Sequence, residues 1–108
     1  MDITKEMILG FSADQAKALH EKIAAFIDRN YADFLDAGLM DDILVNEYKA
    51  GVAKLSCCNN STKETLAGLS TILWQVVECA SECLAEGRKD SVYKDVIGIV
   101  AEAIGLVG

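Results

Sequence analysis

The stretch STKETLAGLSTILWQVVECASECLAEG, residues 61–87, is the clearest helix signal in the chain and the basis of the predicted fold. Ser61 followed by Glu64 has the spacing of a capping box, and Gly87 is typical of the position just beyond a helix end. Between these signals, apolar residues recur every three or four positions and form one broad face, which predicts a helix with more than one packing neighbour. That face comprises Leu66, Leu69, Leu73, Val76, Val77, Ala80 and Leu84, and Ile72, Cys79 and Cys83 widen it at one flank.

Segments on both sides of this helix have the same periodicity and lie between recognisable start and stop signals. Ser12, with Gln15 three residues later, predicts a capping box at the start of one helix. Gly38 predicts the end of that helix, and a split into two helices at Asn30-Tyr31 is an open alternative. The remaining helices are expected over residues 41–57, residues 90–107 and, as a short fifth element, the N-terminal sequence ITKEMILGF (residues 3–11).

The sequence therefore predicts one all-α domain over residues 1–108, built as a compact antiparallel bundle of four to five helices. The chain has 108 residues, of which 52% are hydrophobic, and it has no proline, so nothing opposes a packed helical core. One alternative stays open at about residues 43–57, because the KAG sequence ending at Gly51 separates two apolar runs as a hairpin loop would. That alternative is an α+β fold, in which a lone hairpin would have little support.

The charge balance restricts the kinds of partner that the chain can bind. It has 17 acidic and 10 basic residues, for a net charge of −7. Direct contact with nucleic-acid phosphates or with an anionic membrane requires a basic surface, so both are disfavoured, whereas a basic protein partner is favoured. The N-terminus has no signal-peptide layout, and no apolar stretch is long enough to span a bilayer, so we expect a cytoplasmic location.

Two groups of acidic residues are candidate partner-binding surfaces, although a solvated surface is the plain alternative for both. No base interrupts the first group. The second group follows the polar side of the helix over residues 61–87 at four-residue spacing, where like charges mildly destabilise a helix. Trp74, the only tryptophan, lies off the main apolar face, where it either packs under a loop or the N-terminal segment or is exposed and anchors an interface. The first group comprises Asp33, Asp36, Asp41, Asp42 and Glu47. The second comprises Glu78, Glu82 and Glu86, with Trp74 beside it as the apolar candidate.

The four cysteines form the basis of an alternative hypothesis, a module that binds metal or senses oxidation. Cys57 and Cys58 are adjacent, and Cys79 and Cys83 are four residues apart. Neither pair has the CxxC spacing that is typical of structural zinc sites. Because buried free cysteine commonly packs as a small apolar residue, core packing is the expected role, and no metal is predicted.

We expect no enzymatic activity and no cofactor. The chain has a single histidine, His20, which lies at the edge of an apolar helical face. No Gly-rich nucleophile turn and no phosphate-binding loop accompanies it. An ordinary boundary histidine is therefore the interpretation that the sequence favours, and no catalytic residue is assigned.

The expected function is protein–protein binding, as a stoichiometric inhibitor or neutraliser of a basic partner. Immunity proteins, antitoxins and phage-encoded anti-defence proteins such as anti-CRISPRs are small acidic binders of this general kind. The likeness is one of size, charge and fold class. A further alternative is a structural homodimer with an interface over residues 92–107, where apolar residues cover about half of the helix circumference.

Overall fold

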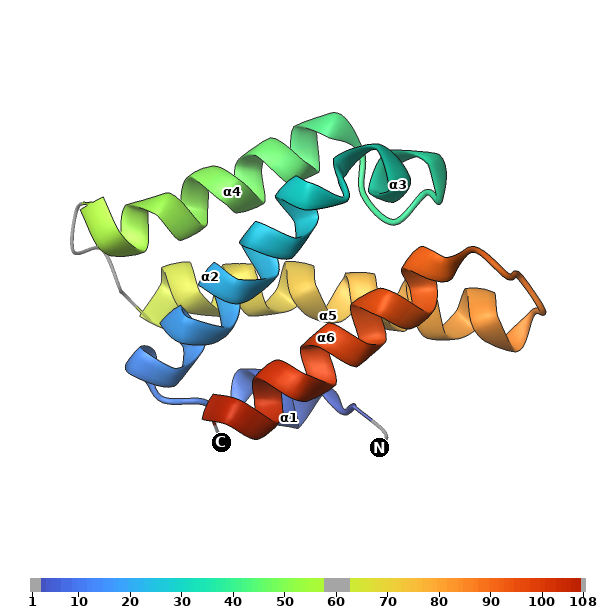
Figure 1. The fold of residues 1–108 in the computed structure, drawn as a ribbon. Helices are drawn as coiled ribbons and strands as arrows, with labels where there is room; N and C mark the ends of the chain where they lie inside the picture. Colours follow the sequence, from blue (N-terminus) through green and yellow to red (C-terminus); the bar gives the residue numbers. More distant parts are fainter. Residues whose placement is uncertain (1–2, 58–62, 108) are drawn as a thin grey trace.

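The computed structural model describes residues 3–57 and 63–107, and these residues form six α-helices (Figure 1). No strand occurs within those two ranges, so the all-α prediction is confirmed. Consecutive long helices run in opposite directions, and α2 and α6 are inclined to α4 and α5 (Figure 1). The helices are α1 (Lys5–Leu9), α2 (Ala13–Arg29), α3 (Tyr31–Asp36), α4 (Asp42–Cys57), α5 (Lys63–Ala85) and α6 (Ser91–Val107).

The described residues form six helices, against the four to five predicted, because the N-terminal segment is helical and the helix that begins after Ser12 is split at Asn30. The N-terminal segment forms α1, which Thr4 caps by accepting a hydrogen bond from the Met7 backbone N–H. The break after Asn30 separates α2 from α3. The side-chain amide of Asn30 donates to the Phe26 carbonyl at 2.9 Å, and the Asn30 backbone N–H bonds to the Phe26 and Ile27 carbonyls, so Asn30 caps the end of α2.

The predicted helix signals coincide with the observed ends wherever the structure describes them. Ser12 and Gln15 form a reciprocal capping box at the start of α2. Gly38 and Gly87 have positive φ angles of 75° and 87° and follow α3 and α5. Beyond each glycine the next residue bonds back to a carbonyl of the last helical turn, as in a Schellman motif. Ser61, the predicted cap of α5, lies outside the described residues.

The hairpin alternative for about residues 43–57 is wrong, because this segment is one helix, α4. Its buried side chains recur at helical spacing and face the core. The glycine that suggested a turn has another role: a Cβ on Gly51 would lie 2.9 Å from Leu69 Cδ2. Gly51 therefore permits the close approach of α4 to α5. The buried positions are Val45, Tyr48, Val52 and Leu55.

Helix α2 lies at the centre of the arrangement and packs against α3, α4, α5 and α6. Three of its side chains, Leu19, Ile23 and Ile27, are fully or almost fully buried. They belong to one core cluster to which all six helices contribute. Helix α5 is the second organising element, since it packs against α1, α2, α4 and α6. The broad apolar face that the sequence predicts for α5 is thereby explained.

Replacing Gly87 by alanine is expected to lower the free energy of unfolding by about 1 kcal/mol, because a Cβ is disfavoured at positive φ. Gly98 provides the matched control: it lies inside α6, and a Cβ there would meet no atom within 4 Å. Gly98→Ala is expected to raise the free energy of unfolding by roughly 0.5–1 kcal/mol. Urea unfolding of both variants measures the effects, and shifts of the same sign would contradict this account of the helix end.

Candidate functional site

The first acidic group is exposed in the structure, but part of it serves the fold. Asp41 caps α4, because its Oδ1 accepts a hydrogen bond from the Leu44 backbone N–H at 2.7 Å. Asp42 accepts hydrogen bonds from the Tyr31 hydroxyl and from the Asn46 side chain. The other three acids of this group are Asp33, Asp36 and Glu47. Their side chains form no ion pair or hydrogen bond with any residue that the structure describes.

Asp33 and Asp36 share a shallow hollow of about 170 Å³ with Asp90, at the junction of α3 with the start of α6. Arg88 pairs with Asp90 at 3.4 Å and partly offsets this negative charge. No cluster of three or more metal-ligating side chains that could hold an ion occurs among residues 3–57 and 63–107. The hollow is therefore an acidic surface feature without the geometry of a metal site.

The second acidic group forms a row along the C-terminal half of α5. Glu78 and Glu82 lie on the helix, Glu86 follows its last residue, and all three are exposed. None of the three ion pairs between described residues includes them. Their placement is unfavourable for the helix twice over: like charges lie four residues apart, and negative charge lies at the negative end of the helix dipole.

Trp74 lies on α5 one turn before Glu78, so the two side chains are neighbours on the helix surface. It is half-buried and packs against the core. It also follows Ser70 by four residues, and Ser70 lines the pocket beside α1. Trp74 thus lies on the same side of α5 as Ser70, half-buried, one turn before the acidic row.

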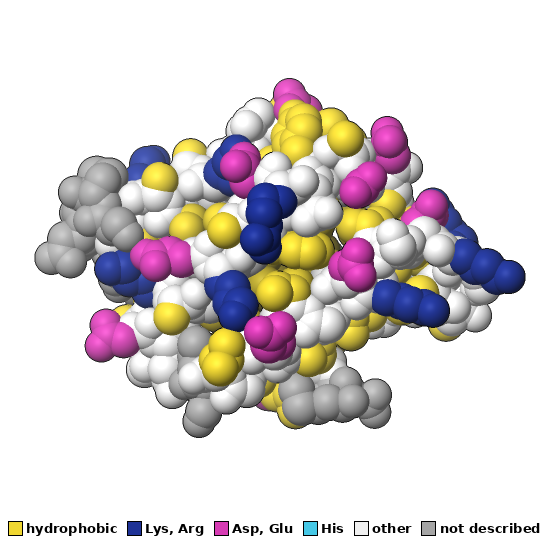
Figure 2. Space-filling model, viewed as in Figure 1, with side chains coloured by type: hydrophobic (Ala, Val, Ile, Leu, Met, Phe, Trp, Pro, Cys, Tyr) yellow, Lys and Arg dark blue, Asp and Glu magenta, His cyan; other side chains and the backbone are white. Residues whose placement is uncertain are grey.

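Charges of both signs are interspersed on the face shown in Figure 2. Two ion pairs join α2 to its neighbours: Lys22 with Glu102 of α6 at 3.5 Å, and Lys49 of α4 with Asp28. Exposed pairs of this kind contribute about 0–1 kcal/mol each. This mixed face lacks the single sign of charge that characterises the row on α5.

The described cysteines are in surroundings that favour packing over thiol chemistry. Cys79 is half-buried, Cys83 is buried, and both are free. Burial, and next the neighbouring Cys83, raise the pKa of the Cys79 thiol, which opposes formation of the reactive thiolate. The thiol hypothesis also involves Cys57 and Cys58. Cys58 and the side chain of Cys57 lie outside what the structure describes.

The apolar face of α6 is largely covered within the chain itself. Val92, Val96 and Val100 are buried where α6 packs against α2 and α5. Leu106 is exposed, and a few isoleucines of α6 are half-buried. The homodimer through residues 92–107 stays a prediction, and these outer side chains are the ones available to such an interface.

A buried polar network that the sequence did not indicate joins α2, α4 and α5. His20 Nδ1 lies 2.8 Å from the Tyr48 hydroxyl, and His20 Nε2 lies 3.1 Å from the Ser70 hydroxyl. His20 and Tyr48 are 0% exposed, and Ser70 is 3% exposed. Burial lowers the pKa of His20 to about 4 and raises that of Tyr48, so both side chains are neutral at pH 7.

This network resembles a catalytic dyad in composition only. Ser70 lies inside α5, where the nearby backbone N–H groups are already bonded within the helix. An acyl-transfer site needs free donors where the oxyanion develops, and the helix interior supplies none from its backbone. The arrangement is better suited to holding three helices in one register, and Ser70 also contributes a hydroxyl to a neighbouring pocket.

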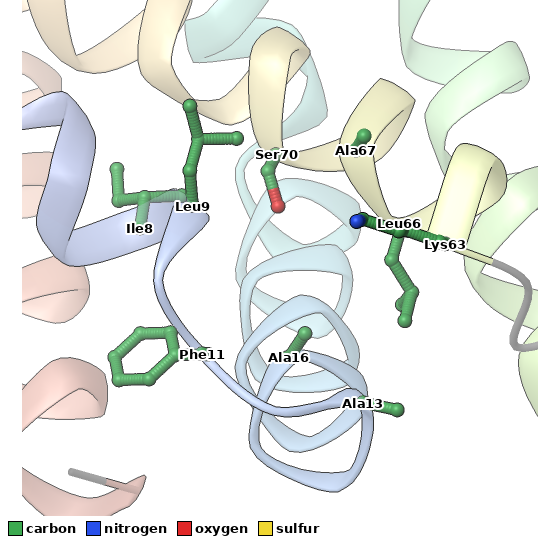
Figure 3. Close-up of a pocket in the computed structure, with 9 residues that line it drawn as sticks. All are labelled: Ile8, Leu9, Phe11, Ala13, Ala16, Lys63, Leu66, Ala67 and Ser70. Carbon is green, nitrogen blue, oxygen red and sulfur yellow. The ribbon is translucent and has the colours of Figure 1, made fainter.

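That pocket lies between α1, the start of α2 and the start of α5, and has a volume of about 300 Å³ (Figure 3). Its lining is mostly apolar. The Ser70 hydroxyl and the Lys63 ammonium both point into it in Figure 3, and they are its polar side-chain groups. The other lining residues are Ile8, Leu9, Phe11, Ala13, Ala16, Leu66 and Ala67.

Comparisons of the chain with protein-family models, with curated proteins and with solved structures found no match. In the part of the chain that the structure describes, no helix combines the length and the apolar character needed to cross a membrane.

Proposed function

We propose that the protein acts by binding a basic protein partner, and that it is a stoichiometric inhibitor or neutraliser of that partner. The supporting observation is the row of exposed carboxylates at the end of α5, which begins one turn after Trp74 and forms no ion pair with any residue that the structure describes. A partner that presents lysine or arginine would convert the repulsion within this row into attraction, and Trp74 would supply the apolar anchor.

The energetics of α5 favour a binding role for the row over a purely solvated one. Four-residue spacing of like charge costs a few tenths of a kcal/mol per pair, and acids in the last turn of a helix are unfavourable as well. Lysine at one of these positions would remove both penalties and keep the surface polar. Stability therefore does not account for Glu78, Glu82 and Glu86, whereas electrostatic attraction to a partner does.

The proposed function is of the general kind carried out by immunity proteins, antitoxins and phage-encoded anti-defence proteins. The expected mechanism is occlusion of a basic surface on the partner, including one that handles nucleic acid. Action in the cytoplasm fits the free thiols Cys79 and Cys83, which a reducing compartment would preserve.

Binding to the partner is expected to fall about tenfold in the variant Glu78→Gln/Glu82→Gln and to weaken further as salt is raised. The partner is first isolated with the wild-type protein from cells of its own source, and affinity is then measured with the purified pair. Because the substitutions remove like-charge repulsion, the variant should unfold at the same or a slightly higher urea concentration. Loss of binding without loss of stability is thus the expected combination.

Two matched variants, each of which also removes two negative charges, locate the surface. Asp33→Asn/Asp36→Asn tests the first acidic group without touching the helix cap provided by Asp41. Glu6→Gln/Asp95→Asn is a control with exposed acids outside both groups. Equal affinity for all three variants would contradict a localised acidic epitope, and loss only with the Asp33 variant would assign binding to the first group.

A further inference from the structure

The pocket beside α1 has the dimensions and the lining of a small-molecule site. Its volume of about 300 Å³ is at the lower end of the range of roughly 300–1,000 Å³ that is typical of such sites. Its wall is formed mainly by aliphatic and aromatic side chains from three helices and the loop between α1 and α2. A ligand that fills it must therefore be small and mostly apolar.

The polar network provides a hydrogen-bond donor at the floor of the pocket. Tyr48 is buried, and its hydroxyl must donate to an acceptor, which is His20 Nδ1. Neutral His20 then carries its proton on Nε2 and donates it to Ser70 Oγ. The hydroxyl proton of Ser70 then has no acceptor among the described residues and is available to a ligand. The neighbouring Thr71, by contrast, donates its hydroxyl proton to the Ala67 carbonyl at 2.9 Å.

Lys63 adds a positive charge at the same place. Its ammonium points into the pocket, and it takes part in none of the ion pairs between described residues. No carboxylate of residues 3–57 or 63–107 lines the pocket, although the chain has 17 acidic and 10 basic residues. One cation, one hydroxyl donor and an apolar wall together suit an anion with a short hydrocarbon chain.

We propose that this pocket binds a small aliphatic carboxylic acid in its carboxylate form. The carboxylate lies between the Lys63 ammonium and the Ser70 hydroxyl, and the hydrocarbon chain packs against Ile8, Phe11 and Leu66. This ligand site is independent of the proposed protein-binding row on α5, because the residues involved are different.

The test is a titration of the full chain with sodium hexanoate, followed by two-dimensional NMR of the backbone amides. We expect saturable binding with a dissociation constant on the order of 1 mM, and shifts centred on α1, Ala16 and Ser70. Hexan-1-ol, which has the same chain without the charge, is expected to bind about tenfold more weakly. Shifts that do not saturate, or that map away from the pocket, would overturn the proposal.

Three variants distinguish the contribution of the Lys63 charge to ligand binding from that of the pocket volume. Lys63→Met keeps the apolar stem and is expected to lower hexanoate affinity about tenfold, with hexan-1-ol affinity unchanged. Ala67→Leu is expected to block both compounds by filling the pocket from an exposed helical position where leucine is well tolerated. Lys94→Met, at an exposed position of α6, should change neither. Equal hexanoate affinity for the wild type and Lys63→Met would overturn the carboxylate assignment. This test does not depend on whether Ala67→Leu folds.

Discussion

Ile23→Ala is expected to lower the free energy of unfolding by about 2–5 kcal/mol, the largest effect of any single substitution considered for this fold. Ile23 is 0% exposed and lies midway along α2, the helix that packs against four others. Truncation removes apolar contacts and leaves a cavity that the surrounding helices cannot all collapse to fill. Such a loss is a large part of the 5–15 kcal/mol that typically stabilises a small domain.

Ile43→Ala is the matched control, since the chemical change is the same and only burial differs. Ile43 is 71% exposed in the first turn of α4. Its truncation is expected to change the free energy of unfolding by less than about 0.5 kcal/mol. Urea unfolding followed by circular dichroism at 222 nm measures both variants. A small loss for Ile23→Ala, or similar losses for both, would contradict the central position of α2.

The helices could be predicted from the sequence because the signals that define them are local. The capping box of Ser12 and Gln15 and the glycines after α3 and α5 act within one helical turn, and the structure places helix ends at each of them. The role of Gly51, by contrast, could not be predicted from local sequence signals. Its turn-like sequence left a hairpin open as an alternative to the predicted helix, but its role depends on Leu69 of another helix. No property of the neighbouring residues in sequence reveals that contact.

The buried network could not be predicted for the same reason. Tyr48 is 28 residues and Ser70 is 50 residues from His20 along the chain, so no spacing pattern connects the three. Ser70 and Trp74 lie off the main apolar face of α5, and for Trp74 the sequence left open both packing under a loop or the N-terminal segment and an exposed position. Helix α1, the short N-terminal helix that the sequence predicts, packs against α5 and lines a pocket together with Ser70.

The exposure of the acidic residues was predictable from the sequence, but their roles were not, apart from a helix cap at Asp41 or Asp42. Both groups lie at the surface, as their polar positions imply. Asp41 and Asp42 turned out to hold the start of α4, so part of the first group is explained by the fold. The row on α5 has no such explanation within the described residues, which is why the binding proposal rests on it.

Acidification from pH 7 to about pH 4 is expected to remove about 3 kcal/mol of stability through His20 alone. Burial lowers the pKa of His20 from 6.5 to about 4 in the folded state. Between these values the unfolded chain binds more protons than the folded chain, so stability rises with pH in this window and falls on acidification. The loss begins near pH 6.5 and is complete below about pH 4.

The geometry explains why a proton on His20 is so unfavourable. A second N–H on the ring would face the Tyr48 hydroxyl, which would have to turn from donor to acceptor. The Tyr48 proton would then lack a partner in the core, and an unsatisfied buried donor costs about 1–3 kcal/mol. The hydrogen-bonding partners of the ring, Tyr48 and Ser70, are both uncharged, so neither offsets the new positive charge.

The variant His20→Gln isolates this contribution, because its side chain does not titrate. It is expected to be less stable than the wild type at pH 7, since it loses ring packing and part of the network. Its stability should depend less steeply on pH between about 6.5 and 4, so that the two curves converge on acidification. Carboxylates titrate alike in both proteins and cancel in the difference. An NMR titration of the His20 ring in the folded protein gives the pKa directly, and a value near 6.5, or parallel stability curves, would show that the network does not exclude the proton.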